Sequence, residues 1–371
     1  TLQGMNGNLA GHYALGSDID ATATAAWNGG AGFSPVGNSS TQFTGVFEGL
    51  GHSLSNVAIS LPGTDHVGLF GYAGEGSSIH NLGLVNVSVN GSGAIGALAG
   101  NNYGTINNAD SSGTVTGSGS YVGGLVGYSA GPISNSNSAA TVSASGNYIG
   151  GLLGWNSHAT INNVYATGAV SSSGTHVGGL VGVNDQGAIS DAYATGKVSG
   201  SGPYVGGLVG WNSYATISNV YATGSVSGNG NVVGGLMGYN DHGTIDNAYA
   251  TGTVSGYQVG GLVGINDHGT ISNSHATGNV GGSSSDYVGG LVGYNNYSSV
   301  RDSYATGTIT GSGTNLGGLL GYDVGSTVTN SHFDVDLSTV NGQSSFALYG
   351  LYHNQLQDWA SHGMSLAIAD Y

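Results

Sequence analysis

Short apolar stretches, separated by glycine and small polar residues, follow one another along most of this chain. In residues 204–231, YVGGLVGWNSYATISNVYATGSVSGNGN, these stretches are two to four residues long and do not continue with helical spacing. Valine, isoleucine, threonine and tyrosine dominate them, which favours strands. The pattern predicts three short strands, around VGGLVGW, TISNVYAT and SVSG.

This unit recurs at a nearly constant interval. The first glycine of the GGLVG-like stretch is Gly68, Gly96, Gly123, Gly150, Gly178, Gly206, Gly234, Gly260, Gly289 and Gly317, so successive units are 26–29 residues apart. About three strands per unit predict one coil of a parallel β-solenoid. Stacking at ~4.8 Å per coil makes the expected all-β molecule an elongated rod roughly 50 Å long.

Two columns of residues support this stacking. Val205 and Leu208 are three positions apart, so both can be buried only if the chain turns a corner at the intervening glycines. An Asn or Asp also recurs two positions after the Ile or Val of the second strand: Asn81, Asn108, Asn135, Asn163, Asp191, Asn219, Asn247, Asn273, Asp302 and Asn330. We interpret this column as a coil-to-coil ladder that satisfies buried turn groups, with an ion-binding row as the alternative.

The repeats divide the chain into three predicted parts. Residues 1–65 are lead-in coils of the solenoid, residues 66–332 are the repeats, and residues 333–371 are a terminal cap. Within the cap, Leu356 and Trp359 are three positions apart, which favours a short helix over 353–362. A cap is expected because an open solenoid end exposes unpaired strand edges.

Composition excludes several partners. The 371 residues include 18 Asp and Glu but only two basic residues, Lys197 and Arg301, and the net charge is −16. A nucleic-acid interface or an attraction to an anionic membrane needs basic patches, so neither is expected. No apolar run is long enough to span a bilayer, and no cofactor is expected, since the glycine-rich stretches lack the Lys and the following helix of a phosphate loop.

The GGLVG stretches resemble the GLUG repeat. The lead-in segments YALGSDIDATATAAWNGGAGFSPVG at 13–37 and FTGVFEGLGHSLSNVAI at 43–59 strengthen the likeness. Together they resemble the repeat regions of filamentous-haemagglutinin-like exoproteins, which Gram-negative bacteria secrete by the two-partner route. The resemblance implies a right-handed parallel β-helix, a secreted or cell-surface location, and adhesive or biofilm roles.

An aromatic stripe is the candidate binding surface. Its members are Tyr165, Tyr193, Tyr221, Tyr249, His275 and Tyr304, and the column continues to His332. Strand alternation puts Val164 and Ala166 inside and Tyr165 outside. Aromatic rings with neighbouring threonines suit a polysaccharide, whereas the alternative is that the rings only stabilise the sheet.

Two Asp–His pairs are weaker candidates. Asp241, His242, Asp267 and His268 occupy matching positions in consecutive units and could hold a metal ion, or the two carboxylates could act in glycoside hydrolysis. Their NDHG context is equally typical of solvated turns. We therefore expect no catalytic residues and no metal.

The leading functional prediction is a secreted, non-enzymatic β-solenoid that forms the stalk or binding segment of a bacterial adhesin or biofilm matrix protein. Its expected partners are a polysaccharide or a host or bacterial cell surface. The alternatives are a carbohydrate-active β-helix enzyme and a self-assembling extracellular fibre with end-to-end association.

Overall fold

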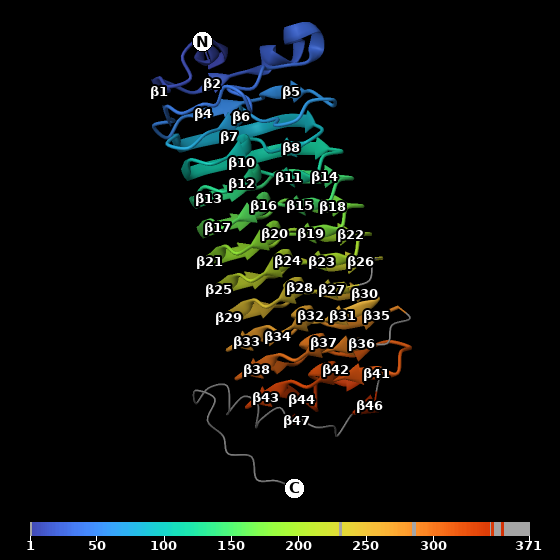
Figure 1. The fold of residues 1–371 in the computed structure, drawn as a ribbon. Helices are drawn as coiled ribbons and strands as arrows, with labels where there is room; N and C mark the ends of the chain where they lie inside the picture. The colour runs from blue at the N-terminus through green and yellow to red at the C-terminus, as the bar shows by residue number, and fades with distance from the viewer. Residues whose placement is uncertain (1, 230–231, 284–286, 342, 345–349, 352–371) are drawn as a thin grey trace.

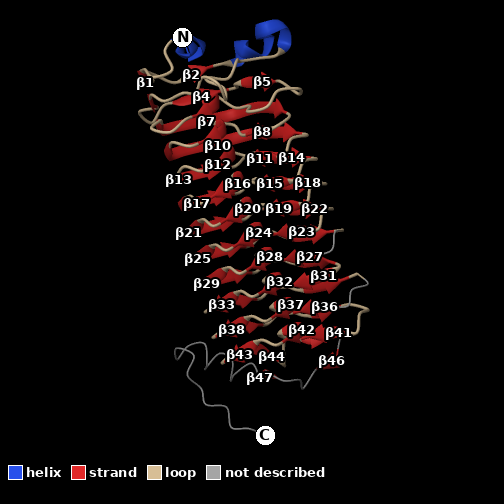
Figure 2. Cartoon of the chain, viewed as in Figure 1, coloured by secondary structure: helices blue, strands red, loops and turns tan. Residues whose placement is uncertain are grey.

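Each sequence unit forms one coil of a parallel β-solenoid in the computed structural model, and the coils stack into an elongated rod (Figure 1). The structure describes residues 2–229, 232–283, 287–341, 343–344 and 350–351. Within these ranges, helix is confined to the N-terminal end, where η1 spans Leu2–Gly7 and η2 spans Thr22–Gly30 (Figure 2). The predicted all-β parallel solenoid is confirmed.

One coil shows how the sequence produces this fold. Strand β23 (Tyr204–Gly206) turns at the glycines into β24 (Val209–Ser213), which is followed by β25 (Thr216–Ala222) and β26 (Val226–Gly228). The stretch VGGLVGW, which the pattern treats as one strand, is therefore divided between two sheets. Val205 and Leu208 are both fully buried, which confirms the corner between them.

Three sheets, which we call A, B and C, run along the rod. Sheet C contains β8 (Ala94–Ile95), β11 (Tyr121–Gly123), β15 (Tyr148–Gly150), β19 (His176–Gly178), β23, β27 (Val232–Gly234), β31 (Gln258–Gly260), β36 (Tyr287–Gly289) and β41 (Asn315–Gly317). Sheet B contains β6 (Phe70–Ala73), β9 (Ala99–Asn102), β12 (Val126–Ser129), β16 (Leu153–Ser157), β20 (Val181–Asp185), β24, β28 (Met237–Asp241), β32 (Val263–Asp267), β37 (Val292–Asn296) and β42 (Leu320–Val324).

Sheet A collects the remaining described strands and bends around the rest of each coil. It contains β1 (His12–Ala14), β2 (Ile19–Asp20), β3 (Val46–Glu48), β4 (Ser53–Ser55), β5 (Ala58–Ser60), β7 (Ser78–Gly91), β10 (Thr105–Gly117), β13 (Ile133–Ser138), β14 (Thr141–Ala144), β17 (Thr160–Ala166), β18 (Val170–Ser172), β21 (Ala188–Ala194), β22 (Val198–Gly200), β25, β26, β29 (Thr244–Ala250), β30 (Val254–Gly256), β33 (Thr270–Ser272), β34 (His275–Ala276), β35 (Val280–Gly282), β38 (Ser299–Arg301), β39 (Tyr304–Ala305), β40 (Ile309–Thr310), β43 (Thr327–Thr329), β44 (His332–Asp334), β45 (Thr339–Val340), β46 (Gln343–Ser344) and β47 (Gly350–Leu351).

Equivalent residues of neighbouring coils pair with each other. Tyr193 of β21 pairs with Tyr221 of β25, and Gly206 of β23 pairs with Gly234 of β27. These ladders are parallel, whereas β45 and β46 pair antiparallel. Because the register keeps like residues together, every column in the sequence becomes a row along the rod.

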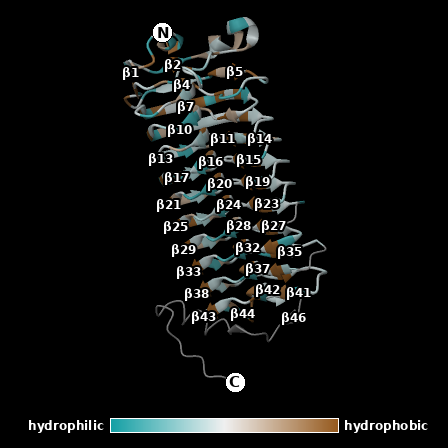
Figure 3. Cartoon of the chain, in the orientation of Figure 1, coloured by the Kyte–Doolittle hydropathy of each residue, from teal (hydrophilic) through white to brown (hydrophobic). Residues whose placement is uncertain are grey.

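The core is a narrow stack of aliphatic side chains. Val209, Ile217 and Val220 are at most 1% exposed, and their equivalents in neighbouring coils are buried in the same way. The apolar positions recur at corresponding places in successive strands (Figure 3). The N-terminal coils hold larger side chains, and the ring centroid of Phe70 lies 4.8 Å from that of Phe43.

The predicted Asn column lies at an exposed turn. Asn219 and Asn247 adopt left-handed backbone conformations with φ of 55° and 50°, which Asn tolerates better than most residues. Asn247 Nδ2 donates to Asn219 Oδ1 at 2.8 Å, so the coil-to-coil hydrogen bonding is confirmed. The expected role in satisfying buried turn groups is wrong for Asn219, because its side chain is exposed.

A second Asn column, which the sequence pattern did not single out, is fully buried. From each residue to the next, Nδ2 donates to Oδ1 at 2.8–2.9 Å along Asn156, Asn184, Asn212, Asn240, Asn266 and Asn295. Asn212 also donates to the carbonyl of Ala215 at 3.0 Å. The row ends where Asn295 donates to Asp323 Oδ1 at 2.8 Å, so a carboxylate accepts from the donor end of the aligned amides.

The N-terminal lead-in is part of the solenoid, whereas most of the C-terminal cap lies outside the described residues. Strand β1 of the lead-in pairs with β3, and β3 pairs with β7, so residues 1–65 contribute strands to sheet A. The predicted helix at 353–362 lies outside the described residues, as does most of the predicted cap at 333–371. Neither of the described helices, η1 and η2, has the length and apolar character of a membrane span.

Candidate functional site

The predicted aromatic stripe lies on the outer face of sheet A. Register pairs Tyr165 with Tyr193, Tyr193 with Tyr221, and Tyr221 with Tyr249. The row continues through His275 and Tyr304. Val164 and Ala166 are buried while Tyr165 is half-buried, as strand alternation predicts.

The rings of this stripe stack on one another. Their centroids are 4.8–5.1 Å apart, and neighbouring ring planes differ by only 1–7°. Each interior ring therefore has both faces covered by its neighbours, and a ligand can reach only the ring edges and the phenolic hydroxyls. Burial raises the pKa of Tyr165, Tyr221 and Tyr304, so these hydroxyls stay protonated at neutral pH.

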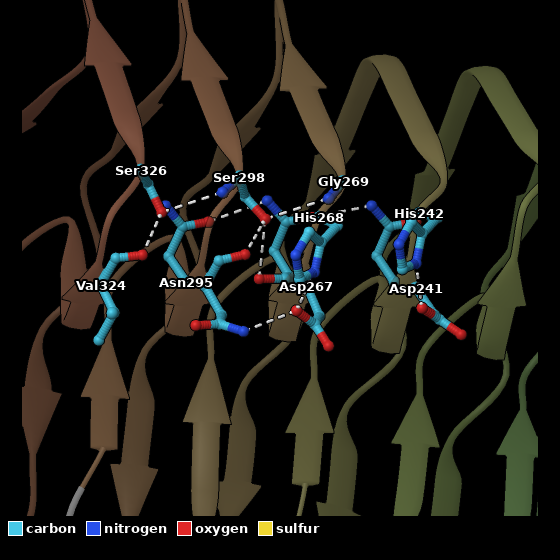
Figure 4. Close-up of polar contacts among 12 residues, drawn as sticks. Asp241, His242, Asp267, His268, Gly269, Asn295, Ser298, Val324 and Ser326 are labelled. Atoms are coloured by element: carbon cyan, nitrogen blue, oxygen red, sulfur yellow. Dashed lines mark hydrogen bonds and ion pairs between the residues drawn. The ribbon is translucent and has the colours of Figure 1, made fainter.

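The two Asp–His pairs lie at the turn between sheets B and A (Figure 4). His242 Nδ1 is 2.6 Å from Asp241 Oδ1, and His268 Nδ1 is 2.7 Å from Asp267 Oδ1. The two imidazole rings stack at 4.8 Å with planes 3° apart. Each ring therefore binds the carboxylate of its own coil.

Asp267 is the most heavily hydrogen-bonded of these carboxylates. Asn296 Nδ2 donates to its Oδ1 at 2.8 Å, and the Tyr239 hydroxyl donates to its Oδ2 at 3.0 Å. Burial opposes ionisation, but the hydrogen bonds from Asn296, Tyr239 and His268 outweigh it and lower the pKa of Asp267. Among the described residues, no group of three or more His, Asp or Glu side chains is arranged to hold a metal ion.

A second aromatic surface, which the sequence analysis missed, follows the corner between sheets C and B. The outward positions of sheet C are Ala94, Tyr121, Tyr148, His176, Tyr204, Val232, Gln258, Tyr287 and Asn315. His66 extends this row by one coil, because the adjacent Val67 forms an isolated bridge to Ile95. Those of sheet B are Tyr72, Asn101, Tyr128, Trp155, Val183, Trp211, Tyr239, Ile265, Tyr294 and Tyr322. We call these two rows the corner rows.

Rings from the two corner rows contact each other across the corner. Tyr148 and Trp155 meet edge to face at 4.6 Å, and His176 stacks on Trp211 at 5.1 Å. Outward side chains of two sheets can touch only where the sheets meet at a concave angle on the outer surface. The signal in the sequence is the aromatic residue on either side of the glycine corner, as in YVGGLVGW.

The corner is hollow in the coil of Ala94 and Asn101, whereas the later coil without rings carries the longer side chains of Gln258 and Ile265. Ala94 stands between His66 and Tyr121 in the first corner row, and Asn101 stands between Tyr72 and Tyr128 in the second. The ring of Tyr103 lies between those of Tyr72 and Tyr128, so the second row has a ring here although Asn101 does not supply it. The first row has none at Ala94, and a cavity of about 540 Å³ opens there, lined by residues that include His66, Tyr121 and Tyr128. A volume of this size is typical of small-ligand sites.

Comparison with known proteins identifies the repeat. The GLUG motif matches residues 145–171, 173–199, 201–227, 229–255, 255–281 and 284–310. The chain therefore contains six GLUG motifs, which confirms that part of the resemblance. These motifs do not show the expected link with filamentous haemagglutinin and two-partner secretion.

Two relatives share parts of the sequence. Halomucin of Haloquadratum walsbyi is 40% identical over 123 residues, which are 32% of this chain and 1% of halomucin. A protein of Evansella cellulosilytica, described as a candidate glycine-rich membrane protein, is 39% identical over 100 residues, which are 26% of this chain and 12% of that protein. The chain thus matches only a small part of either relative.

One solved structure matches part of the chain. A Bacteroides ovatus chain described as a candidate immunoglobulin A1 protease is 24% identical and has a TM-score of 0.47, over 69% of this chain and 74% of that chain. At this level the likeness carries no argument.

Proposed function

We propose that this chain is a non-enzymatic rod segment of a secreted or cell-surface bacterial adhesin or extracellular matrix protein. The single observation that supports this most is the unbroken, in-register stacking of coils from β6 to β42, which gives a stiff spacer of defined length. The nine intervals between these ten strands, at ~4.8 Å each, span roughly 43 Å. Secretion by the two-partner route is the finer part of the proposal and rests on the resemblance of the lead-in segments.

Three further observations agree with this role. The GLUG motifs place the chain among repeat proteins, and the names of its relatives, a halomucin and a candidate membrane protein, favour the cell envelope. The absence of cysteine suits export without requiring disulfide formation. The Asp–His pairs offer little to a glycoside hydrolase, since Asp241 and Asp267 are each bonded to their own histidine rather than free to face a sugar.

The test uses cells of the source organism. Antibodies against residues 66–332 should label intact, unpermeabilised cells or the surrounding matrix. Deleting the coding segment for those residues should reduce attachment or biofilm mass, and replacing it with a flexible Gly/Ser segment of equal length should not restore attachment, because a random coil is not a stiff spacer. Labelling only after permeabilisation, or normal attachment after deletion, would overturn the proposal.

A further inference from the structure

We propose that the hollow beside Ala94 and Asn101 is a binding site for an uncharged polysaccharide, which inserts one sugar ring where the first corner row lacks an aromatic side chain at Ala94. The proposal rests on the extracellular role proposed above, because a rod outside the cell is exposed to polysaccharides of the matrix and of cell surfaces. It assigns the binding to the corner between sheets B and C rather than to the stacked stripe of sheet A.

The hollow lies at a position of the first corner row that has no ring. Register places Ala94 next to Tyr121 and Asn101 next to Tyr128, so both small residues belong to the same coil. His66 and Tyr72, in contact at 5.6 Å, occupy the same two positions one coil earlier. The cavity is therefore bounded by aromatic side chains in the coils on both sides and is open along the corner.

Tyr103 completes the wall next to Asn101. Its ring stacks on Tyr72 at 5.2 Å with planes 8° apart, and it meets Tyr128 at 5.7 Å with planes tilted by 39°. Unlike the rings of the sheet A stripe, the rings around the hollow do not all lie parallel, and the ring planes of Tyr121 and Tyr128 differ by 74°. Rings set at different angles around a cavity can present faces and edges to the apolar side of a sugar.

Polar groups around the cavity fit the hydroxyls of a sugar. Asp65, Asn101 and serines of the adjoining turns line the cavity. His66 Nδ1 lies 3.0 Å from Asn101 Oδ1, which fixes the amide against the wall. Burial raises the pKa of Tyr103 and Tyr128, so both phenols remain protonated and can donate hydrogen bonds at neutral pH.

Charge selects against anionic polymers. None of the lining residues is Lys or Arg, and Asp65 is acidic. The only basic residues of the whole chain are Lys197 and Arg301, in later coils, and the net charge is −16. An anionic polysaccharide would meet repulsion at this cavity, whereas a neutral one loses nothing by the lack of cations.

The experiment fills the hollow with the side chain that its own row uses elsewhere. Ala94→Tyr should restore the ring pattern of Tyr121 and Tyr148, and Gln258→Tyr makes the same addition to the same row far from the cavity. Binding of neutral hexasaccharides (cellohexaose, maltohexaose and mannohexaose) to the intact chain is measured by calorimetry, with a hexagalacturonate as the anionic probe. Thermal unfolding verifies that both variants fold.

We expect the parent and Gln258→Tyr to bind at least one neutral probe, and Ala94→Tyr to bind it roughly tenfold more weakly or worse. Removing a wall ring by Tyr121→Ala should also weaken binding, and hexagalacturonate should not bind. No binding of any neutral probe, or equal binding by Ala94→Tyr and the parent, overturns the inference. So does a dimer of the parent that Ala94→Tyr abolishes, which would mean that a second copy fills the cavity.

These outcomes are separate from those of the rod proposal. A chain that fails to bind glycans but is found on intact cells and is needed for attachment leaves the rod function standing. A chain that binds the neutral probes but is found only inside cells retains the binding site and loses the rod function.

Discussion

Asn212 donates a hydrogen bond from Nδ2 to Oδ1 of Asn240, and this 2.9 Å contact joins two coils through the interior of the rod. Both side chains are fully buried. Asn212 also accepts from Asn184 and donates to the carbonyl of Ala215, so one side chain serves three partners. A buried amide is stable here only because the neighbouring coils repeat it.

The first prediction concerns this ladder. Asn212→Leu should lower the free energy of unfolding by about 3 kcal/mol, because it leaves buried polar groups of Asn184, Ala215 and Asn240 without their partner. The adjacent Ser213→Ala should change it by less than about 0.5 kcal/mol. Equal effects of the two substitutions in urea unfolding would mean that the ladder contributes no stability.

The exposed Asn column should respond to backbone conformation instead. Asn219→Val should destabilise by roughly 1–2 kcal/mol, because Asn219 has φ 55° and a β-branched residue is strained there. Asn219→Gly should cost less, although it removes the same side-chain hydrogen bonds. If Asn219→Gly lowers the melting temperature as much as Asn219→Val, the loss of stability comes from the missing side-chain hydrogen bonds and not from backbone strain.

The glycine corner allows a matched pair of substitutions. A Cβ on Gly206 would lie 2.0 Å from the Val209 carbonyl oxygen and 2.8 Å from the Gly238 nitrogen, both backbone atoms, whereas a Cβ on Gly281 would meet nothing closer than 3.5 Å. Gly206→Ala should therefore abolish cooperative folding or cost more than about 4 kcal/mol, and Gly281→Ala should be tolerated. Similar circular dichroism melts for both would contradict the close packing at the corner.

Stability should fall in mild acid because of His176. Burial lowers its pKa to about 4, from an ordinary value near 6.5 in the unfolded chain. Below about pH 6.5 the unfolded state takes up a proton that the folded state resists, so stability decreases as the pH falls from about 6.5 to 4, by about 3 kcal/mol at most. His176→Tyr, which matches Tyr148 and Tyr204 in its row, should flatten this part of a plot of melting temperature against pH. An unchanged slope would assign the acid sensitivity to other groups.

The stacked stripe of sheet A gives a prediction that separates structure from binding. Tyr221→Ala with Tyr249→Ala breaks several ring contacts of 4.8–5.1 Å and should cost roughly 1–3 kcal/mol. Tyr221→Phe with Tyr249→Phe keeps the stack and removes only the hydroxyls. If the stripe also binds glycans, as the sequence analysis proposed, the Phe variant should weaken that binding without lowering the melting temperature.

The repeat period was enough to predict the solenoid, the glycine corner and the outward tyrosines, because each depends on spacing along one unit. The buried Asn ladder escaped prediction because strand alternation puts Trp211 inside and Asn212 outside. In the structure Val209 and Asn212 are both buried although they are three positions apart, so the alternation shifts phase near Gly210.

The hollow beside Ala94 and Asn101 could not be predicted from the sequence for a different reason. Ala94 and Asn101 are unremarkable in the sequence, and each departs from its own column of aromatic residues. Only the path of the coil, which folds sheet C against sheet B at the corner, brings the two departures together. The tyrosines of sheet A recur at regular spacing in the sequence, but regular spacing also lets the rings cover one another.

The equivalence of neighbouring coils has a genetic consequence. Gly178, Gly206 and Gly234 pair in successive coils at the same corner, each 28 residues after the last. Recombination between the codons of two of these glycines would add or remove whole coils. The coils on either side of the junction would still pair in register. Rod length can therefore change between related genes in steps of one coil, without a new contact having to evolve at each step.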